Sequence, residues 1–225
     1  ENFLTDGKLQ FIRAWIEAGA PEVGIIADKK LLTDSTRYMP KPFSSLDPPE
    51  KGFQIHLGPF EVQPNFEREF FHYSDIKLIE DVFVSRIEIE MRPGSHHFIL
   101  YSFKGDTQQG DLPAFGVNRE LRDSGGSLQA PILLTMQNHQ FFGGTQWPRL
   151  DYKMPVGVGL RLPSSFGLDQ NVHYVNRTDS LMIGEVFSNI HTIERSDIQH
   201  EAEMFTMSNR TFSLPPKKVT TIEKT

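Results

Sequence analysis

Alternating apolar and polar residues dominate the chain after Gly52 and predict a series of short β-strands. Along residues 83–91, Arg86, Glu88 and Glu90 share one face, which is typical of a strand with one side in water. Further strands are predicted at residues 53–57, 97–103, 131–136, 158–162, 168–175, 182–192, 211–214 and 219–223. Because turn residues such as Gly143-Gly144 separate these runs and no long helix intervenes, we predict a mainly-β fold, an antiparallel, jelly-roll-like β-sandwich.

The first 51 residues follow a different pattern. Residues 8–18 place Leu9, Ile12 and Trp15 at helical spacing and predict an amphipathic helix, with Asp6 as its N-cap. Four prolines between residues 28 and 51 disfavour regular structure, so this stretch is expected to be loop-like.

These patterns divide the chain into four predicted parts. They are a helix within residues 1–21, a Pro-rich linker at 22–51, a β-sandwich domain at 52–205 and the start of a second sandwich domain at 206–225. The chain opens directly into a helical pattern and stops within a strand-like run. We therefore expect it to be a piece of a longer, exported protein.

Composition narrows the possible functions. The net charge of −6 gives no reason to expect nucleic acid or an anionic membrane as a partner, and no apolar run approaches the length of a membrane span. The chain contains no cysteine, which excludes disulfides, thiolate metal sites and c-type haem attachment within it. Any metal ion must therefore bind imidazole, carboxylate or thioether groups.

The adjacent pair His96-His97, taken together with His173, is the strongest candidate for chemistry. Neighbouring residues in a regular strand point to opposite faces, so both imidazoles of the pair can reach one metal ion only where the strand begins or bulges. The preceding Pro93-Gly94-Ser95 permits such a distortion. Neutral imidazole suits zinc, copper, iron and nickel, and the spacing alone does not choose between zinc and copper.

The strand predicted around His173 places this histidine on the more polar of its two faces. Asn171 and Asp169 share that face, whereas Val172 and Tyr174 share the other. An accessible metal site requires a ligand on such a polar face. We expect Tyr101, Asn171 and Asp169 to be the groups that orient the imidazoles.

The segments around these histidines resemble the copper type II, ascorbate-dependent monooxygenases, which include peptidylglycine α-hydroxylating monooxygenase and dopamine β-monooxygenase. The resemblance covers roughly residues 52–200 and is carried by MRPGSHHFILY (91–101), MPVGVG (154–159) and DQNVHYVN (169–176). It implies that His96, His97 and His173 hold the electron-transfer copper of a bacterial-type member. It further implies export from the cytoplasm and loading by a reductant such as ascorbate.

The chain departs from this family in one respect that limits its activity. The family's second domain supplies the catalytic copper through a His-x-His pair and a distant Met, and this chain has no His-x-His. The resemblance therefore implies a second copper domain as a partner and no hydroxylation by this chain alone. Residues 11–21 resemble the closing helix of small c-type cytochrome domains, which adds such a domain as a partner, although an ordinary amphipathic helix packed on the sandwich explains this stretch equally well.

The other histidines are weaker candidates. His139 precedes a predicted flexible loop and is a candidate for lining a site. His191 and His200 lie near Met204 and Met207, an imidazole and thioether mixture that suits Cu(I), whereas His56 and His72 are expected to be surface or packing residues. Two short segments starting at Asn176 and Asn209 match the glycosylation pattern.

A different class of function competes with the copper hypothesis. A sandwich without a catalytic copper site also fits a non-catalytic binding or assembly module of an exported multidomain protein. A zinc-binding or hydrolytic role is a third alternative, but no Ser-His-Asp or paired-carboxylate arrangement supports hydrolysis.

Overall fold

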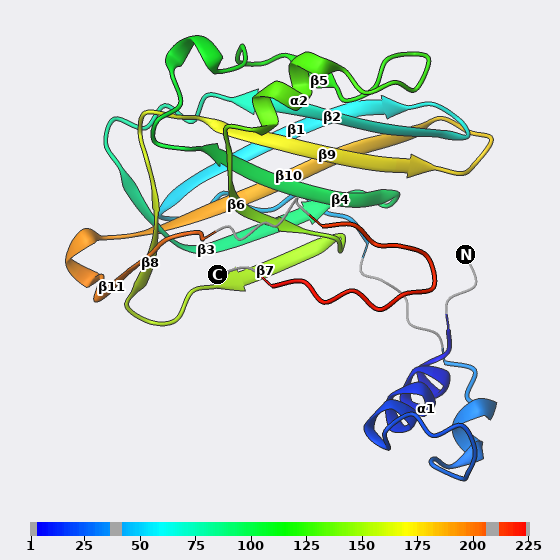
Figure 1. Cartoon of the computed structure of the whole chain (residues 1–225). Helices are drawn as coiled ribbons and strands as arrows, with labels where there is room; N and C mark the ends of the chain where they lie inside the picture. Colours follow the sequence, from blue (N-terminus) through cyan, green and yellow to red (C-terminus); the bar gives the residue numbers. More distant parts are fainter. Residues whose placement is uncertain (1–3, 37–41, 206–211, 224–225) are drawn as a thin grey trace. The chain divides into compact units, whose positions relative to one another are not determined.

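The computed structural model describes residues 4–36, 42–205 and 212–223, which form parts of two compact units, Glu1–Pro42 and Phe43–Thr225. The first unit contains helix α1 (Asp6–Glu17) and the 3-10 helix η1 (Lys29–Thr33). The second contains the strands that form the sandwich (Figure 1).

The first unit begins at a cap one residue earlier than the pattern predicts. Thr5 is the N-cap of α1, its side-chain oxygen accepting a hydrogen bond from the backbone N–H of Lys8 at 3.3 Å, so Asp6 is the first helical residue. The predicted loop at 28–51 contains η1, because the Asp28 carboxylate accepts the backbone N–H of Lys30 at 2.9 Å and starts a short helix.

Two sheets make up the second unit, as Figure 1 shows. The larger sheet has the order β1 (Gly52–Val62), β10 (Met182–Ile193), β3 (Val82–Met91), β8 (Val158–Leu162) and β11 (His200–Ala202), with β7 (Arg149–Lys153) also paired to β3. The smaller sheet has the order β5 (Asn118–Glu120), β2 (Phe66–Ser74), β9 (Leu168–Asn176), β4 (Ser95–Phe103) and β6 (His139–Thr145). Except for the parallel β8–β11 pair, the described pairings are antiparallel, and the predicted β-sandwich is confirmed.

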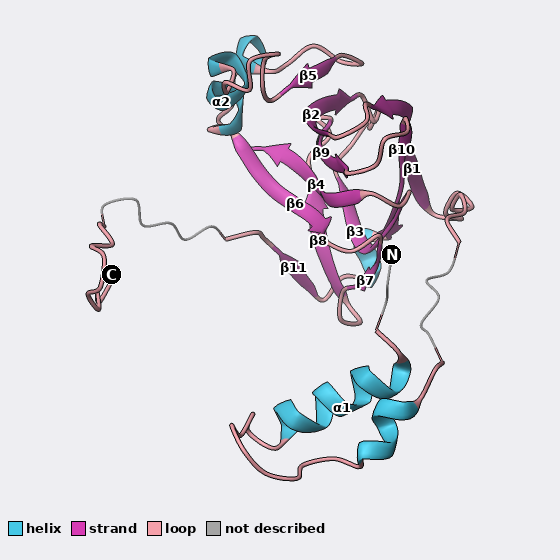
Figure 2. Cartoon of the chain, turned by 90° about the vertical axis from the view of Figure 1, so that its right-hand side faces the viewer, coloured by secondary structure: helices cyan, strands magenta, loops and turns pink. Residues whose placement is uncertain are grey.

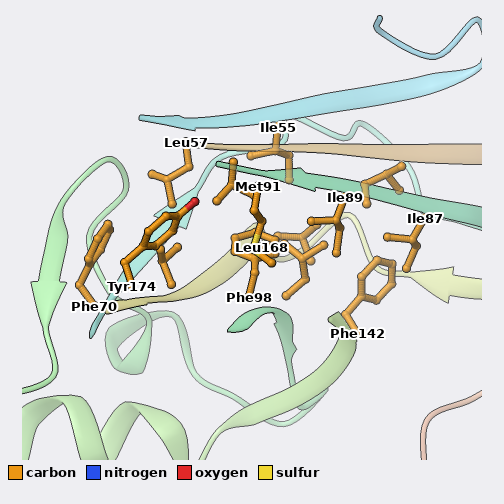
Figure 3. Close-up of a cluster of buried hydrophobic side chains, with 14 of the residues drawn as sticks. Ile55, Leu57, Phe70, Ile87, Ile89, Met91, Phe98, Phe142, Leu168 and Tyr174 are labelled. Atoms are coloured by element: carbon orange, nitrogen blue, oxygen red, sulfur yellow. The ribbon is translucent and has the colours of Figure 1, made fainter. Parts of the chain in front are cut away.

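The apolar core lies between the two sheets (Figure 3). Ile87 and Ile89 of β3 face Phe98 and Leu100 of β4, and all four side chains are buried. Tyr174 of β9 joins this cluster, and its hydroxyl donates to the backbone carbonyl of Glu185 at 3.0 Å. Because Tyr174 points into the core, the neighbouring His173 must point to the outer face of the smaller sheet.

A short helix covers this outer face. Helix α2 (Ala130–Met136) packs Ile132 against Phe71 and Leu121, and it lies on the side of the smaller sheet that faces away from β3 (Figures 1 and 2). The predicted strand at 131–136 is therefore wrong. Pro131 stands in the first turn of α2, where its fixed φ favours a helix start, and Ile132 is the helix's single buried residue.

Three further predictions from the pattern also differ from the structure. Gly143 and Gly144 lie inside β6 rather than in a turn. The backbone of β4 approaches so closely that a Cβ on Gly144 would lie 2.8 Å from the carbonyl oxygen of Phe98, so the glycine serves strand packing. Residues 212–214 and 219–223 have no strand assignment, and Leu214 and Val219 are exposed there rather than packed in the core. Thr211, the first residue of one predicted strand, lies outside the described residues.

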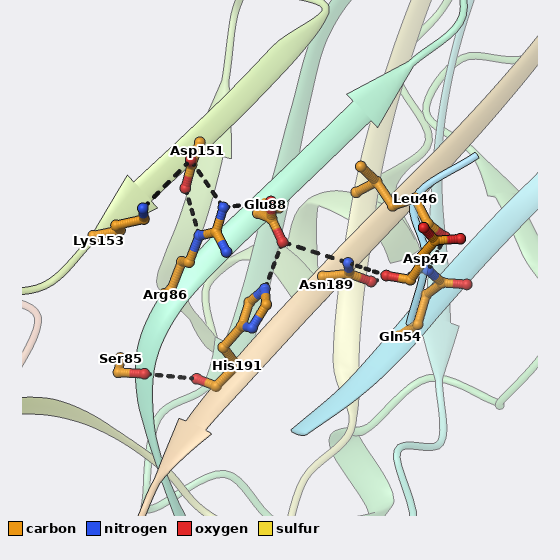
Figure 4. A network of polar contacts seen from close by, with 10 residues as sticks. All are labelled: Leu46, Asp47, Gln54, Ser85, Arg86, Glu88, Asp151, Lys153, Asn189 and His191. Atoms are coloured by element: carbon orange, nitrogen blue, oxygen red, sulfur yellow. Dashed lines mark hydrogen bonds and ion pairs between the residues drawn. The ribbon is translucent and has the colours of Figure 1, made fainter. Parts of the chain in front are cut away.

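The segment before β1 is fixed to the outer face of the larger sheet (Figure 4). Gln54 donates from its amide to the carbonyl of Leu46 at 2.7 Å, and Asn189 donates to the carbonyl of Asp47 at 2.8 Å. Beside them, Glu88 accepts from His191 at 2.5 Å and from Arg86 at 2.6 Å. These polar side chains on the outer face of the larger sheet therefore hydrogen-bond to one another and to the segment before β1.

The core position of Leu100 yields a first prediction. Leu100→Ala is expected to lower the free energy of unfolding by about 2–5 kcal/mol, because it removes a fully buried side chain between the sheets. Urea unfolding followed by circular dichroism measures this loss. The matched control Leu214→Ala, at an exposed position, is expected to change stability by less than about 0.5 kcal/mol, and equal losses would place Leu100 outside the core.

Candidate metal centre

A bulge at the start of β4 brings the histidine pair to one side of the sheet. In the pairing of β4 with β9, Ser95 lies opposite Tyr174 and His97 lies opposite His173, so β4 has one extra residue, His96, at this point. Gly94, with a φ of +95°, turns the chain into this bulge. The distortion predicted from Pro93-Gly94-Ser95 is confirmed.

The three imidazoles converge on one point. Nδ1 of His97 lies 3.3 Å from Nδ1 of His96 and 3.4 Å from Nδ1 of His173, and one nitrogen from each ring lies within 4.8 Å of the others. Two nitrogens bound at about 2.0–2.1 Å to a single tetrahedral ion lie about 3.3 Å apart. The spacing of these rings therefore fits a shared metal ion, and the predicted site residues His96, His97 and His173 do come together.

Partners at the opposite ring nitrogen fix the orientation of two of these imidazoles. Nε2 of His97 lies 2.8 Å from Oδ1 of Asn171 and 3.5 Å from a carboxylate oxygen of Glu69. Nε2 of His173 lies 2.7 Å from a carboxylate oxygen of Glu67. Because these oxygens are acceptors, the neutral form of each ring carries its proton on Nε2 and leaves the lone pair of Nδ1 directed at the shared point.

Burial of the site increases from His96 to His173. His96 is exposed, His97 is half-buried and His173 is buried. Burial lowers the pKa of His173 below 6.5, and the nearby Glu69 and Glu67 oppose this shift only in part. Burial therefore favours the neutral ring of His173, and only the neutral ring can bind a metal ion.

The pKa of His97 shifts in the other direction. The hydrogen bond to Glu69 raises the pKa of His97 above 6.5, against the opposing effect of burial. Burial raises the pKa of Glu69, but its hydrogen bonds with His97 and Asn171 outweigh burial and the pKa lies below 4.5. Glu69 is therefore ionised at neutral pH and supplies a negative charge beside any cation held at the centre.

Of the three orienting groups predicted from the sequence, Asn171 contacts the centre, through His97, and the other two contact His139 instead. Asp169 pairs instead with Arg119 and with Nε2 of His139 at 2.9 Å, and the ring of Tyr101 stacks on His139 with ring centres 4.4 Å apart. Asp169 is four residues from His173, and Tyr101 is four residues from His97. Four residues span about 14 Å along a strand, so a shared face does not bring these side chains to the centre.

Sequence reasoning missed Glu67 and Glu69, because the strand that carries them, β2, was not predicted. Glu67, Glu69, Phe71 and Tyr73 alternate with Phe66, Arg68, Phe70 and His72 along this strand. Each face therefore mixes charged or polar side chains with aromatic ones and shows no clear period of two, and the available signal was the aromatic-rich run itself. The pairing of Glu69 with His173, across β2 and β9, then brings the carboxylates to the centre.

The remaining histidines have structural partners. His139 lies at the start of β6, buried against Asp169 rather than beside a flexible loop, and does not join the centre. His56 stacks on Phe187 and contacts Glu185, and His72 contacts Asn118, so both are packing or surface residues as predicted.

The predicted Cu(I) alternative does not form among the described residues. His191 contacts Glu88, His200 is exposed at β11, and Met204 packs against the apolar core. Met207 lies outside the described residues.

Asn176, which begins one of the glycosylation patterns, has a structural role. Its side-chain amide is buried and donates to the carbonyls of Val62, Gln63 and Ser180 at 2.8–3.0 Å. An amide with three such bonds is not accessible to a glycosylating enzyme in the folded chain. Asn209 lies outside the described residues.

Comparison of the chain with protein-family models, with curated proteins and with solved structures found no match. In residues 4–36, 42–205 and 212–223, the helices are all too short or too polar to cross a bilayer.

The contact between Glu69 and His97 yields a second prediction. In the metal-free protein, Glu69→Gln removes the main cause of the raised pKa of His97, so this pKa is expected to fall towards or below 6.5. A raised folded-state pKa stabilises the fold below about pH 6.5 and this stabilisation is lost as the pH rises through the folded-state pKa. Glu69→Gln should therefore remove stability mainly on the acidic side.

Histidine proton resonances followed by NMR from pH 5 to 8 measure this pKa. The control Glu61→Gln changes an exposed carboxylate of β1, away from the imidazoles, and is expected to leave the titration of His97 unchanged. An unaltered pKa for His97 in Glu69→Gln would contradict the assigned contact.

Proposed function

We propose that His96, His97 and His173 hold a copper ion that accepts and gives up single electrons, as the electron-transfer domain of a copper-dependent monooxygenase. The observation that carries this proposal is the convergence of three Nδ1 atoms at separations of 3.3 and 3.4 Å, with acceptors at Nε2 of His97 and His173. The site residues fit a metal ion on this geometry, independently of the family resemblance.

The donor set favours copper over the other metals that imidazole binds. The cluster contains three imidazoles and no thiolate, since the chain has no cysteine. Among divalent first-row metals, Cu²⁺ has the highest affinity for a given nitrogen site, and Zn²⁺ has a lower affinity. The resemblance to the copper monooxygenases points to the same metal.

The chain's own residues keep the imidazoles in place while the charge of the centre changes. The bulge in β4 sets the positions from which the side chains of His96 and His97 extend, and the contacts at Nε2 hold the ring orientations of His97 and His173. A ligand set that does not need to rearrange suits repeated electron uptake and release. The exposed edge of the site, at His96, gives redox partners access to the centre.

Oxygen activation and hydroxylation are assigned in this proposal to a second copper domain, which receives the electrons. The chain itself has no His-x-His to build such a catalytic site. The family resemblance implies that the protein is exported from the cytoplasm and that an external reductant supplies the electrons.

The proposal predicts one Cu²⁺ bound per chain. Titration of the metal-free protein is expected to give a saturable Cu²⁺ EPR signal with nitrogen hyperfine structure. His173→Ala removes one of three ligands and is expected to weaken binding by more than about 100-fold. The control His200→Ala changes an exposed histidine of β11 and is expected to leave the affinity unchanged.

The electron-transfer role has its own test on the loaded protein. Anaerobic addition of a one-electron reductant is expected to abolish the EPR signal, and reoxidation is expected to restore it without loss of copper. Full-affinity binding by His173→Ala, or zinc displacing copper at equal concentration, would reject the copper centre. A bound but irreversibly reduced ion would reject the electron-transfer role and favour the non-catalytic module.

A further inference from the structure

A cavity of about 510 Å³ lies beside the metal centre, between the start of β2 and the loop that connects β5 to α2. Its walls include Glu67 and Glu69, the two residues whose carboxylates contact the imidazoles. The opposite wall comes from Asp123 and the following glycine-containing loop. A molecule in this cavity would therefore touch the groups that orient the metal ligands.

Glu67 connects the cavity to the buried part of the centre. Its side chain is 61% exposed, yet it accepts a 2.7 Å hydrogen bond from the imidazole of His173, which is only 9% exposed. One hydrogen bond thus separates a solvent-accessible carboxylate from a metal-ligating ring. A molecule in the cavity thus has a second route to the centre, besides the exposed ring of His96.

The lining of the cavity indicates the kind of molecule that fits. The ring of Phe66 is 51% exposed and offers a face for stacking. Four carboxylates and two guanidinium groups line the cavity, which gives it a net charge of −2 from 4 acidic and 2 basic residues: Glu67, Glu69, Glu120, Asp123, Arg68 and Arg122.

The two cationic side chains are already engaged. Arg68 pairs with Glu120 at 2.6 Å, and Arg122 donates to the carbonyl of Gly126 at 3.0 Å. Neither guanidinium is therefore directed solely at an incoming ligand. The carboxylates have hydrogen-bond partners as well, but acidic groups outnumber guanidinium groups in the lining. An aromatic face in such a negatively charged lining attracts aromatic cations and repels anions.

We propose that this cavity binds a small aromatic one-electron donor that carries no negative charge, and that its electron reaches the centre through the Glu67–His173 hydrogen bond. The electron-transfer part of this proposal rests on the copper centre proposed above. A neutral donor would lose one electron and become a radical cation, and a cationic donor would become a radical dication. The Cu²⁺ that the three imidazoles would hold would take up that electron and become Cu⁺, with no covalent bond or proton exchanged. An anionic reductant such as ascorbate is disfavoured at this entry point.

Binding is tested on the metal-free protein with a redox-inert pair of probes. Phenyltrimethylammonium is expected to shift the backbone NMR resonances of Phe66 and Gly125, whereas benzenesulfonate, of similar size and opposite charge, is expected to leave them unchanged. Phe66→Ala with Asp123→Asn removes the stacking face and one charge, and is expected to weaken binding of the cation by about five- to tenfold.

The matched control for this variant is Phe205→Ala with Asp197→Asn, which changes an exposed aromatic ring and an exposed carboxylate outside the cavity. It is expected to bind the cation as the unchanged protein does. Equal binding of both probes, shifts confined to other residues, or equal weakening in the two double variants would overturn the cavity assignment.

Electron entry is tested on the copper-loaded protein by stopped-flow. Reduction by tetramethyl-p-phenylenediamine is expected to slow severalfold in the cavity variant, and reduction by ascorbate is expected to accelerate with added salt as repulsion is screened. Faster reduction by ascorbate at low salt, or a rate unaffected by the cavity variant, would overturn the entry route. A protein that binds the cation but no copper would instead overturn the proposed function and leave the cavity assignment standing.

Discussion

The pairing of β4 with β9 is the constraint on which the site depends. Val172 and Tyr174 of β9 must enter the core, and this sets His173 on the outer face opposite His97. The one-residue bulge at His96 shifts the register of β4 against β9 between Ser95 and His97, and this brings the imidazoles of His96 and His97 to the same side of the sheet. A slip of one residue would turn the imidazoles inward and the apolar side chains into water.

Local patterns determined the parts of this picture that the sequence could predict. The strand around His173, the polarity of its face and the distortion at Gly94-Ser95 all follow from residues within a few positions of each other. The prediction of a strand at 131–136 was wrong because a short apolar segment has no clear period, and because Pro131 favours the start of a helix. The domain boundaries and the second copper domain stay predictions.

The groups that orient the imidazoles were less predictable, because they depend on strand pairing. Glu67 and Glu69 are more than 100 residues from their partners Asn171 and His173, with separations of 106 for Glu67–His173 and 102 for Glu69–Asn171. Only the position of β2 beside β9 brings them together. Asp169 shares the correct face but lies too far along β9, and it forms a separate buried cluster with Arg119 and His139.

The pairing of β4 with β9 also implies that a bound ion would affect the stability of the fold. His97 and His173 are 76 residues apart in the chain, so an ion held by both closes a long loop of the polypeptide. In a chain without cysteine, such an ion would be a cross-link between two central strands that forms and breaks with the supply of metal. The cross-linked chain would have fewer unfolded conformations, and the sheet that carries the site would resist unfolding for as long as the ion stays bound.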